Sequence, residues 1–501
     1  MDEKRKTDIW TGGQNPPVTA VSLPAAPESR NVRNPVRTEI ESWFERHSDD
    51  MIHDLGRLVA INSVRGPAEE GKPNGAGPHA ALMLAREMLE AHGFTVNNFE
   101  DIIITADMGG EPVRLGILAH LDIVEAGAGW DTEPFTLTGR GGNLYGRGAS
   151  DDKGPAVAAM YAMYCVRDIC PELRCGVRLI LGSGEETGMK DVAQYLSKRE
   201  TPPHLFTPDA NYPVVNVEKG RFLPVFGASW DEDSGLPRVV SISGGATANI
   251  VPNRAEAVVE GFTPEAIEGL RREFSAKTGA SISARADGEK TVITAEGAAA
   301  HAANPDCGLN AQTALIEMLA AMPFANSAGF KYIRALNRLF PHWDYNGRAL
   351  GIAMSDDISG ALTVNFGTLS FTAAGFHASF DSRTPVCADD ADLAGIVRGA
   401  FEREGISLRR ADVSKSHRTP PDSPLVQSLL RIYKEYTGNV PECLSIGGQT
   451  YVHGIPGGVA FGCALPGIDN RVHGANEFIG AEQLIVSAKM FAQAIIDMAR
   501  G

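Results

Sequence analysis

The sequence predicts an α/β fold in which a largely parallel sheet flanked by helices is interrupted by an α+β insertion. Mostly apolar runs at 114–124 and 177–182 are typical of buried strands. Helical apolar spacing alternates with these runs, at 35–61, 80–92 and 155–166. Such alternation favours parallel strands joined by helices. The pattern changes after about Gly220 and resumes near residue 415, so the intervening segment is predicted to be inserted into the first fold.

The inserted segment, from about Gly220 to about Val413, mixes short alternating strands with helices. The predicted strands lie at 238–243, 291–295 and around 362–381, and the predicted helices at 264–274, 309–322 and 389–403. Two further helices, at 424–437 and 482–499, return the chain to the α/β pattern. Residues 1–36 are rich in Pro, Asn, Ser and charge, and we expect a loose extension there.

Composition and charge exclude several kinds of partner. The 501 residues suggest two or three domains, and 46 basic against 62 acidic residues give a net charge of −16. That acidic excess argues against nucleic acid and against an anionic membrane surface. The first residues lack the apolar core of a secretory signal, so we expect none, and the sequence contains no apolar stretch of about 20 residues. Its seven cysteines form no CxxC pair, which indicates free thiols, and we expect a cytoplasmic protein.

His120 and Asp122 stand near the end of the predicted strand at 114–124. Residues two apart in a strand share a face, so these two side chains are predicted to be neighbours. A histidine that binds a metal needs its other ring nitrogen held by an acceptor, often a carboxylate. The alternative is a single strand-end histidine beside a solvated aspartate, and the two interpretations are about equally supported.

Asp151 and Asp152 follow a glycine-rich turn directly before a predicted helix. Helix capping explains such a pair by itself. A site with two metal ions, however, needs a carboxylate between them, because ions about 3.5–4 Å apart repel each other. Asp151 is placed to provide that bridge.

Glu185 and Glu186 follow the apolar run at 177–182, at the edge of an α/β sheet where ligands bind. Neighbouring side chains diverge, so one glutamate can bind a metal while the other accepts a proton from a bound water. Asp209 and His473 are further candidates, although each taken alone is better explained by a Pro-Asp turn and by a polar surface loop, respectively. Together these carboxylates and imidazoles suit zinc, manganese or cobalt.

Five stretches of the chain, in order between residues 119 and 478, resemble the dinuclear metallopeptidases that include carnosinase, aminoacylase and glutamate carboxypeptidase. The stretches are AHLDIVEAGAGWDTEPF, LYGRGASDDKGP, LILGSGEETGMKD, TPDANYPVVNVEKG and RVHGANEF. Within that family the chain is most similar to bacterial Xaa-His dipeptidases of the PepV type. The resemblance implies a dipeptidase of Xaa-His or broad specificity. An N-acyl-amino-acid deacylase or desuccinylase is one alternative, and a catalytically dead relative that binds metal or peptide is another.

The resemblance also implies two divalent ions, zinc first, with manganese or cobalt as alternatives. It assigns His120 and Asp209 to one ion and Glu186 and His473 to the other, with Asp151 bridging them. It implies a cis peptide bond between Asp151 and Asp152, an orienting role for Asp122 and a general-base role for Glu185.

By the same resemblance, residues 37–220 and 415–501 form a catalytic domain, and residues 221–414 form a lid over it. His301 is expected to stabilise the oxyanion, and substrate binding is assigned to Asn249, Arg383 and Thr450. One departure is Gln449, where related dipeptidases have glycine, and it puts the dipeptide preference in doubt. The large insertion implies a monomer that acts on a small peptide substrate.

Overall fold

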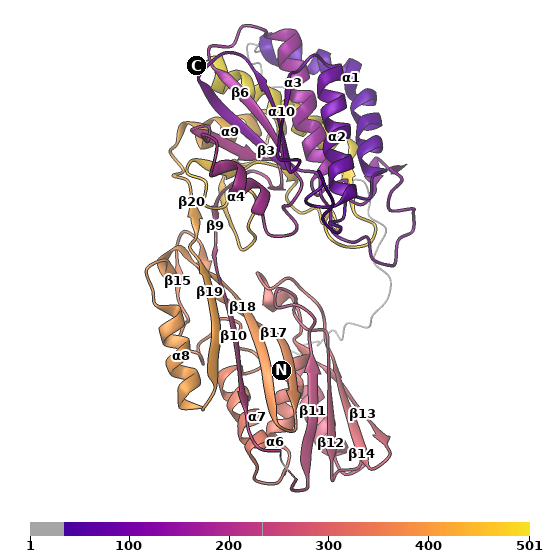
Figure 1. Cartoon of the computed structure of the whole chain (residues 1–501), viewed down its shortest axis with the longest axis vertical. Helices are drawn as coiled ribbons and strands as arrows, with labels where there is room; N and C mark the ends of the chain where they lie inside the picture. The colour runs from indigo at the N-terminus through magenta and orange to yellow at the C-terminus, as the bar shows by residue number, and fades with distance from the viewer. Residues whose placement is uncertain (1–34, 233, 501) are drawn as a thin grey trace, which may run out of the picture.

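The computed structural model describes residues 35–232 and 234–500, so residues 1–34 of the predicted extension lie outside the described residues. The described chain forms two parts, one above the other along its longest axis, and each is built on its own sheet (Figure 1). The first part contains the first and the last helix. The second part contains the strands between Gly220 and Ser414.

The first part is built on a nine-stranded mixed sheet. In spatial order its strands are β1 (Val96–Phe99), β2 (Ile103–Met108), β6 (Gly176–Gly182), β3 (Val113–His120), β7 (His204–Thr207), β22 (Gly458–Ala460), β9 (Val214–Glu218) and β20 (His417–Arg418), with β21 (Cys443–Ile446) also beside β9. The central strands β6, β3, β7 and β22 run parallel, as predicted. Strands β1 and β2 at one side and β20 at the other pair antiparallel.

Helices cover both faces of this sheet unequally. The larger core lies under five helices: α1 (Pro35–Val59), α2 (Ala76–Ala91), α3 (Lys153–Ile169), α9 (Pro424–Thr437) and α10 (Ala481–Arg500). The smaller core lies on the opposite face, under α4 (Lys190–Leu196) and the segment around Tyr451. Alternation along β3 sends Ile117 and Ala119 into the larger core and Leu118 into the smaller one. The same alternation puts His120 on the face of Leu118, with its ring 6.0 Å from that of Tyr451.

Two small sheets connect distant loops of the first part. Strand β24 (Phe478–Gly480) pairs with β5 (Asn143–Tyr145), which pairs in turn with β4 (Thr138–Arg140). Strand β8 (Ala210–Asn211) pairs with β23 (Cys463–Ala464). The β24–β5 pairing brings the segment after His473 next to the segment before Asp151.

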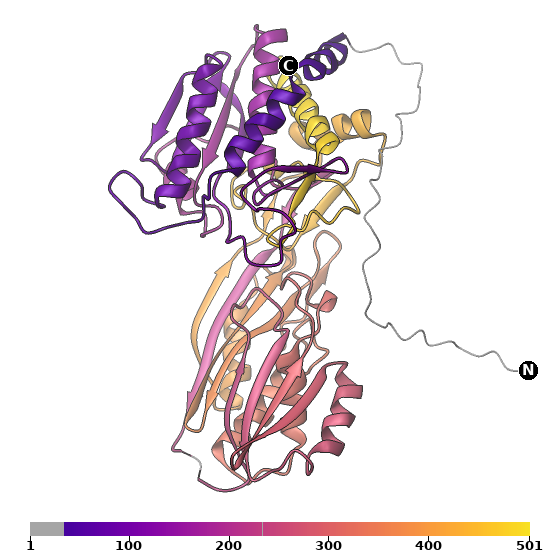
Figure 2. The ribbon, with the colours of Figure 1, turned by 90° about the vertical axis from the view of Figure 1, so that its right-hand side faces the viewer.

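The second part is an eight-stranded antiparallel sheet packed against helices. In spatial order its strands are β13 (Ser281–Asp287), β14 (Lys290–Glu296), β12 (Arg254–Glu260), β11 (Arg238–Gly244), β17 (Thr363–Thr372), β18 (Gly375–Thr384), β10 (Gly220–Ser229) and β19 (Ser407–Ser414). Its helices are α5 (Glu268–Thr278), α6 (Ala311–Ala321), α7 (Ala328–Leu339) and α8 (Leu393–Arg403). Short pieces complete it: β15 (Ser355–Asp356), β16 (Gly360–Ala361) and 3-10 turns at Pro305–Cys307 and Val386–Ala388. The chain enters through β9–β10 and returns through β19–β20 (Figures 1 and 2).

The predicted elements are present, with shifts in the second part. The helix predicted at 264–274 is α5, which begins and ends four residues later. Helix α7 and strands β10, β12, β13 and β19 were not predicted. All seven cysteines are free thiols, as predicted. In the described residues no helix combines the length and apolar character that a membrane crossing needs.

Candidate metal centre and active site

Five predicted metal ligands come together where the central strands of the first sheet end. His120 ends β3, Asp151 precedes α3, Glu186 follows β6, Asp209 follows β7, and His473 lies in the loop before β24. Parallel strands place their carboxyl ends at one edge of a sheet, which brings together residues that are far apart in the chain. The structure therefore assembles the whole predicted ligand set.

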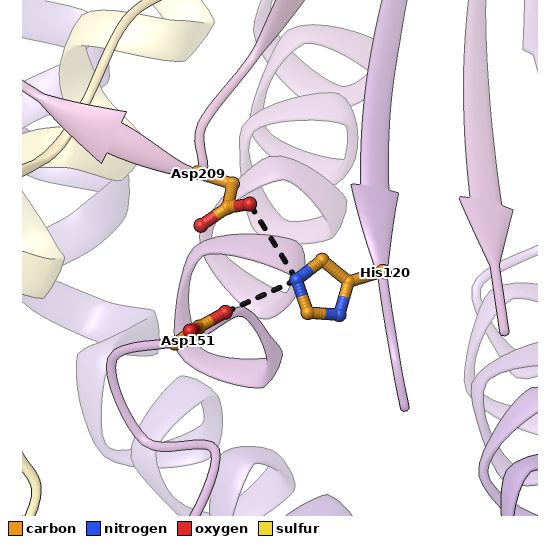
Figure 3. A group of neighbouring side chains, drawn as sticks. All are labelled: His120, Asp151 and Asp209. Carbon is orange, nitrogen blue, oxygen red and sulfur yellow. Dashed lines mark ion pairs between the residues drawn. The ribbon is translucent and has the colours of Figure 1, made fainter. Parts of the chain in front are cut away.

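The first group of donors is His120, Asp151 and Asp209, whose side chains converge in Figure 3. His120 Nε2 lies 3.1 Å from Asp151 Oδ1 and 3.5 Å from Asp209 Oδ2. The opposite ring nitrogen, Nδ1, lies 3.0 Å from the Asp122 carbonyl oxygen and 3.5 Å from Asp122 Oδ1. Among the described residues no hydrogen bond satisfies the buried Nε2 atom. A buried nitrogen that faces two carboxylates while its opposite nitrogen is held fits a metal ligand.

The second group is Asp151, Glu186 and His473. His473 Nε2 lies 2.9 Å from Asp151 Oδ2 and 3.1 Å from Glu186 Oε1. Asp151 thus offers one oxygen to each group, and the donor atoms of each group lie within 4.8 Å of one another. The predicted cis bond between Asp151 and Asp152 is present. Nitrogen and carboxylate donors in two groups with one shared carboxylate fit two divalent ions.

Asp122 connects His120 with the turn that carries the two glutamates. Its carboxylate accepts the backbone N–H of Glu185 at 3.2 Å and of Glu186 at 3.1 Å. Burial is the largest cause that raises the pKa of Glu185 well above its usual value, and the carboxylates of Asp209, Glu186 and Asp151 add to it while His120 opposes. Glu185 is therefore a buried carboxyl group with a raised affinity for a proton, beside both donor groups.

Tyr451 and Asp191 support the same turn from the smaller core. Tyr451 is buried, its hydroxyl donates to Asp191 Oδ2 at 2.5 Å, and it accepts the Gly184 N–H at 3.3 Å. Asp191 Oδ2 also accepts the Ser183 N–H at 2.9 Å. The turn from Ser183 to Glu186 is thus fixed by side chains on three separate segments.

His301 and Asn249 lie side by side in the second part. A β-bridge pairs Ile250 with His301, and the Ala302 N–H donates to the Asn249 carbonyl at 2.9 Å. The Ala303 N–H donates to His301 Nδ1 at 3.2 Å, so the neutral ring carries its hydrogen on Nε2. Desolvation, followed by the charge of Arg383, lowers the pKa of His301 to about 4, and the charge of His473 in the same chain contributes. His301 is therefore a neutral donor at physiological pH.

Arg383 and Thr450 are both engaged within the protein. Arg383 Nε and Nη2 donate to Asp381 at 2.7 and 3.1 Å, and Nη1 donates to the Gly447 carbonyl at 2.6 Å. The Thr450 hydroxyl donates to the buried Glu218 at 2.7 Å. Contact of either side chain with a substrate stays a prediction.

The side chain of Gln449 turns toward the connection between the two parts. Its Nε2 atom donates to the Lys219 carbonyl at 3.3 Å and to Ser414 Oγ at 3.2 Å. His453, in the same loop, contacts Glu218 Oε2 at 2.9 Å and the Lys415 carbonyl at 3.0 Å. The loop of Gln449 and His453 is thus attached to both chain connections between the two parts.

A buried ion pair that the sequence did not predict lies next to the candidate metal ligands. Arg147 and Glu477 are 1% and 0% exposed, and they lie 2.5 Å apart at Nη1 and Oε2. Both belong to stretches that carry the family resemblance, LYGRGASDDKGP and RVHGANEF. An arginine and a glutamate inside these stretches could have been singled out as candidates for an ion pair. The sequence does not indicate that their side chains contact each other.

Comparisons with known proteins agree with this geometry. The model of Peptidase family M20/M25/M40 matches residues 116–497. The putative dipeptidase YtjP of Bacillus subtilis (strain 168) is 34% identical over 461 residues, which cover 91% of this chain and 98% of the relative. The Beta-Ala-Xaa dipeptidase of Lactobacillus delbrueckii subsp. lactis is 31% identical, with 91% and 97% covered. The crystal structure of human carnosine dipeptidase 1 matches with a TM-score of 0.53 at 16% identity, covering 93% and 99%, and supports the fold.

Proposed function

Because the chain belongs to peptidase family M20/M25/M40, it is a hydrolase, and we propose that it is a dipeptidase that uses two divalent metal ions. The observation that carries the proposal is the pair of donor groups that share Asp151, with Glu185 beside them. Relatives named as dipeptidases, at 34% and 31% identity over 91% of the chain, support the choice of substrate class.

The residues of the first part would hold the ions and move the proton. His120 and Asp209 would bind one ion, Glu186 and His473 the other, and Asp151 both. Two such ions supply a water molecule whose pKa is lowered toward about 7, and they polarise the scissile carbonyl. Glu185, a buried carboxyl group, would accept the proton of the attacking water and pass it to the leaving amine. The His473 side chain is 54% exposed, so a substrate would reach the second donor group from the side of His473.

The second part, residues 221–414, would act as a lid over the catalytic domain formed by residues 37–220 and 415–501. His301 would donate its Nε2–H to the oxyanion, a task that suits a neutral imidazole. The Arg383 side chain has five N–H donors, and its three hydrogen bonds use one each on Nε, Nη1 and Nη2. One N–H on Nη1 and one on Nη2 would therefore remain for a substrate carboxylate. Asn249 beside His301 and Thr450 in the facing loop would complete the substrate site.

A deacylase or desuccinylase of the same family is the second candidate, since it would use the same metal site. A catalytically dead relative is the third, and the presence of Glu185 argues against it. We expect the enzyme to work as a monomer in the cytoplasm on small peptides, with zinc as the first metal and manganese or cobalt as alternatives.

A substrate panel with metal removal tests the proposal. Purified protein is assayed on Xaa-His, β-alanyl and other dipeptides and on N-acetyl and N-succinyl amino acids, before and after chelation. We expect dipeptide hydrolysis that chelation abolishes and that zinc, manganese or cobalt restores. Faster hydrolysis of the acylated amino acids would select the deacylase. Full activity in metal-free protein would remove the metal assignment.

A further inference from the structure

The buried ion pair of Arg147 and Glu477 contacts the two turns that carry ligands of the second donor group. Glu477 Oε1 accepts the backbone N–H groups of Ser150 and Asp151, at 2.9 and 3.1 Å. Those bonds hold the turn from which the Asp151 carboxylate projects. Glu477 Oε2 receives Nη1 of Arg147 at 2.5 Å.

Arg147 extends the contact to the loop of His473. Its Nη2 atom donates to the carbonyl of Gly474 at 2.9 Å, and lies 3.4 and 3.3 Å from the carbonyls of Glu125 and Ala126. Its guanidinium also lies 5.3 Å from the ring of Trp130. The Gly474 carbonyl is one peptide unit away from the ligand candidate His473.

The loop of His473 has a backbone that needs such support. His473, Arg471 and Asn476 have φ angles of 62°, 56° and 60°, in the left-handed region that side chains other than glycine rarely adopt. A residue stays in that region only where its surroundings over-determine it. Asn476 supplies a second attachment, since it accepts the Asp131 N–H at 2.7 Å and donates to Asp131 Oδ2 at 3.1 Å.

We propose that the Arg147–Glu477 pair positions Asp151 and His473 so that the Asp151–Glu186–His473 group is preformed for its metal ion. Two of the three donors in this group depend on the pair, and the third, Glu186, is held separately by Asp122. In the other group only Asp151 depends on it. His120 is fixed at the end of β3, and Asp209 by its own turn, where its N–H donates to Thr207 Oγ1. This inference rests on the proposed two-metal site.

A purely structural role would have different consequences. Burying two charges is costly, and replacing a buried ion pair by apolar side chains of similar size is often neutral for stability. Here the bonds of the pair end on the backbone of the ligand-bearing turns. Loss of the pair should therefore weaken one metal position selectively, by the 10–100-fold that is typical of partners behind metal ligands.

The test is a metal titration of the double variant Arg147→Met/Glu477→Met, which leaves no unpaired buried charge. Chelated parental and variant proteins are titrated with zinc by calorimetry, and ions retained after desalting are counted. We expect two tight ions in the parent. In the variant we expect one tight ion and a second bound about 10–100-fold more weakly. Arg147→Lys keeps the buried positive charge but loses the donor to Gly474, and it should show the same selective loss if the double variant does not fold.

A matched control is the pair of Arg178 and Asp107, which forms two bonds of 2.7 and 2.8 Å between β6 and β2 in the same part. Arg178→Met/Asp107→Asn should bind both ions like the parent. Unchanged affinity for both ions in the Arg147 and Glu477 variants would overturn the inference and leave the proposed function intact. Equal weakening of both ions, with a lowered melting temperature of the metal-free protein, would also overturn it. A parent that binds fewer than two ions would instead contradict the proposed function.

Discussion

Glu185 and Glu186 are neighbours in the chain, yet their surroundings give them different tasks. Glu186 Oε1 lies 3.1 Å from His473 Nε2, inside the second donor group. Glu185 belongs to neither group, and burial raises its pKa well above the usual value. A carboxylate that is desolvated but not committed to a metal is suited to accept a proton at neutral pH.

Replacement of Glu185 by Gln should separate catalysis from metal binding. We expect turnover to fall by about 10²–10⁴, the contribution of a positioned general base, with two ions still bound. The matched variant is Glu186→Gln, which should lose affinity for one ion. Metal counting by atomic emission, together with kcat on a good dipeptide, measures both effects. Loss of metal from Glu185→Gln with retention in Glu186→Gln would mean that the two assignments are exchanged.

At the scale of elements, the end of strand β18 meets the loop that follows β21. Arg383 lies near the end of β18 and donates to Asp381 on its own strand. It also donates to the carbonyl of Gly447, which belongs to the first part, so this hydrogen bond joins the two parts. Arg221 on the neighbouring strand β10 pairs with the same Asp381 at 2.9 Å and lies opposite Arg383 in the register. The two arginines share one buried carboxylate, but only Arg383 contacts the loop of Thr450.

Arg383→Met should therefore affect substrates through their free carboxylate. We expect kcat/KM for a dipeptide to fall much more than kcat/KM for the same dipeptide with an amidated C-terminus, because only the first presents a carboxylate to the guanidinium. Arg221→Met is the control, and it should change both substrates alike. If Arg383→Met also reduces both substrates equally, its role is to fasten β18 to the Gly447 loop.

The strength of local patterns decided which elements could be predicted. Strands β3 and β6 are mostly apolar and mostly buried, and helices α1 and α10 are long, so the sequence alone reveals them. In the second part the edge strands β13 and β19 are largely exposed, with only Ile282 of β13 buried, so their apolar alternation is weak. Helix α7 was not predicted, although its buried residues Ile333, Leu336 and Leu339 follow helical spacing and it is no shorter than the predicted helices α5, α6 and α8.

The candidate metal ligands could be predicted from the sequence for one reason, and the residues that contact their backbone could not be predicted for another. His120, Asp151, Glu186, Asp209 and His473 each stand at the end of a recognisable element or inside a family motif. Arg147 meets Glu477 across 330 positions of sequence, and Glu218 meets His453 across 235. Such pairings depend on how loops pack in three dimensions, and no local spacing encodes them.

For the whole molecule, the length of the inserted segment bears on whether one chain suffices for catalysis. In the described chain, the eight-stranded sheet with α5 to α8 is joined to the first part by two chain connections, from β9 to β10 and from β19 to β20 (Figure 1). The loop from Gly447 to His453 is attached to both crossings, through Gln449 and His453. For a second part that acts as the proposed lid, small changes at these two connections would rotate it as a unit, which is the usual form of hinge closure.

We predict that His301 serves the active site of its own chain and that the protein works as a monomer. The inserted segment is long enough to act as a complete lid on its own chain, and an oxyanion donor must come within hydrogen-bond distance when a lid closes. The test mixes inactive Glu185→Ala chains with inactive His301→Ala chains. If His301 acts within its own chain, every active site lacks one of the two groups, so no mixture should regain activity and light scattering should give the mass of one chain.

If lids instead served partner sites, a mixed dimer would contain one intact site, because the intact Glu185 of one chain would meet the intact His301 of the other. Recovery of about a quarter to a half of parental activity, together with a dimer mass, would therefore establish exchange between chains and contradict the prediction.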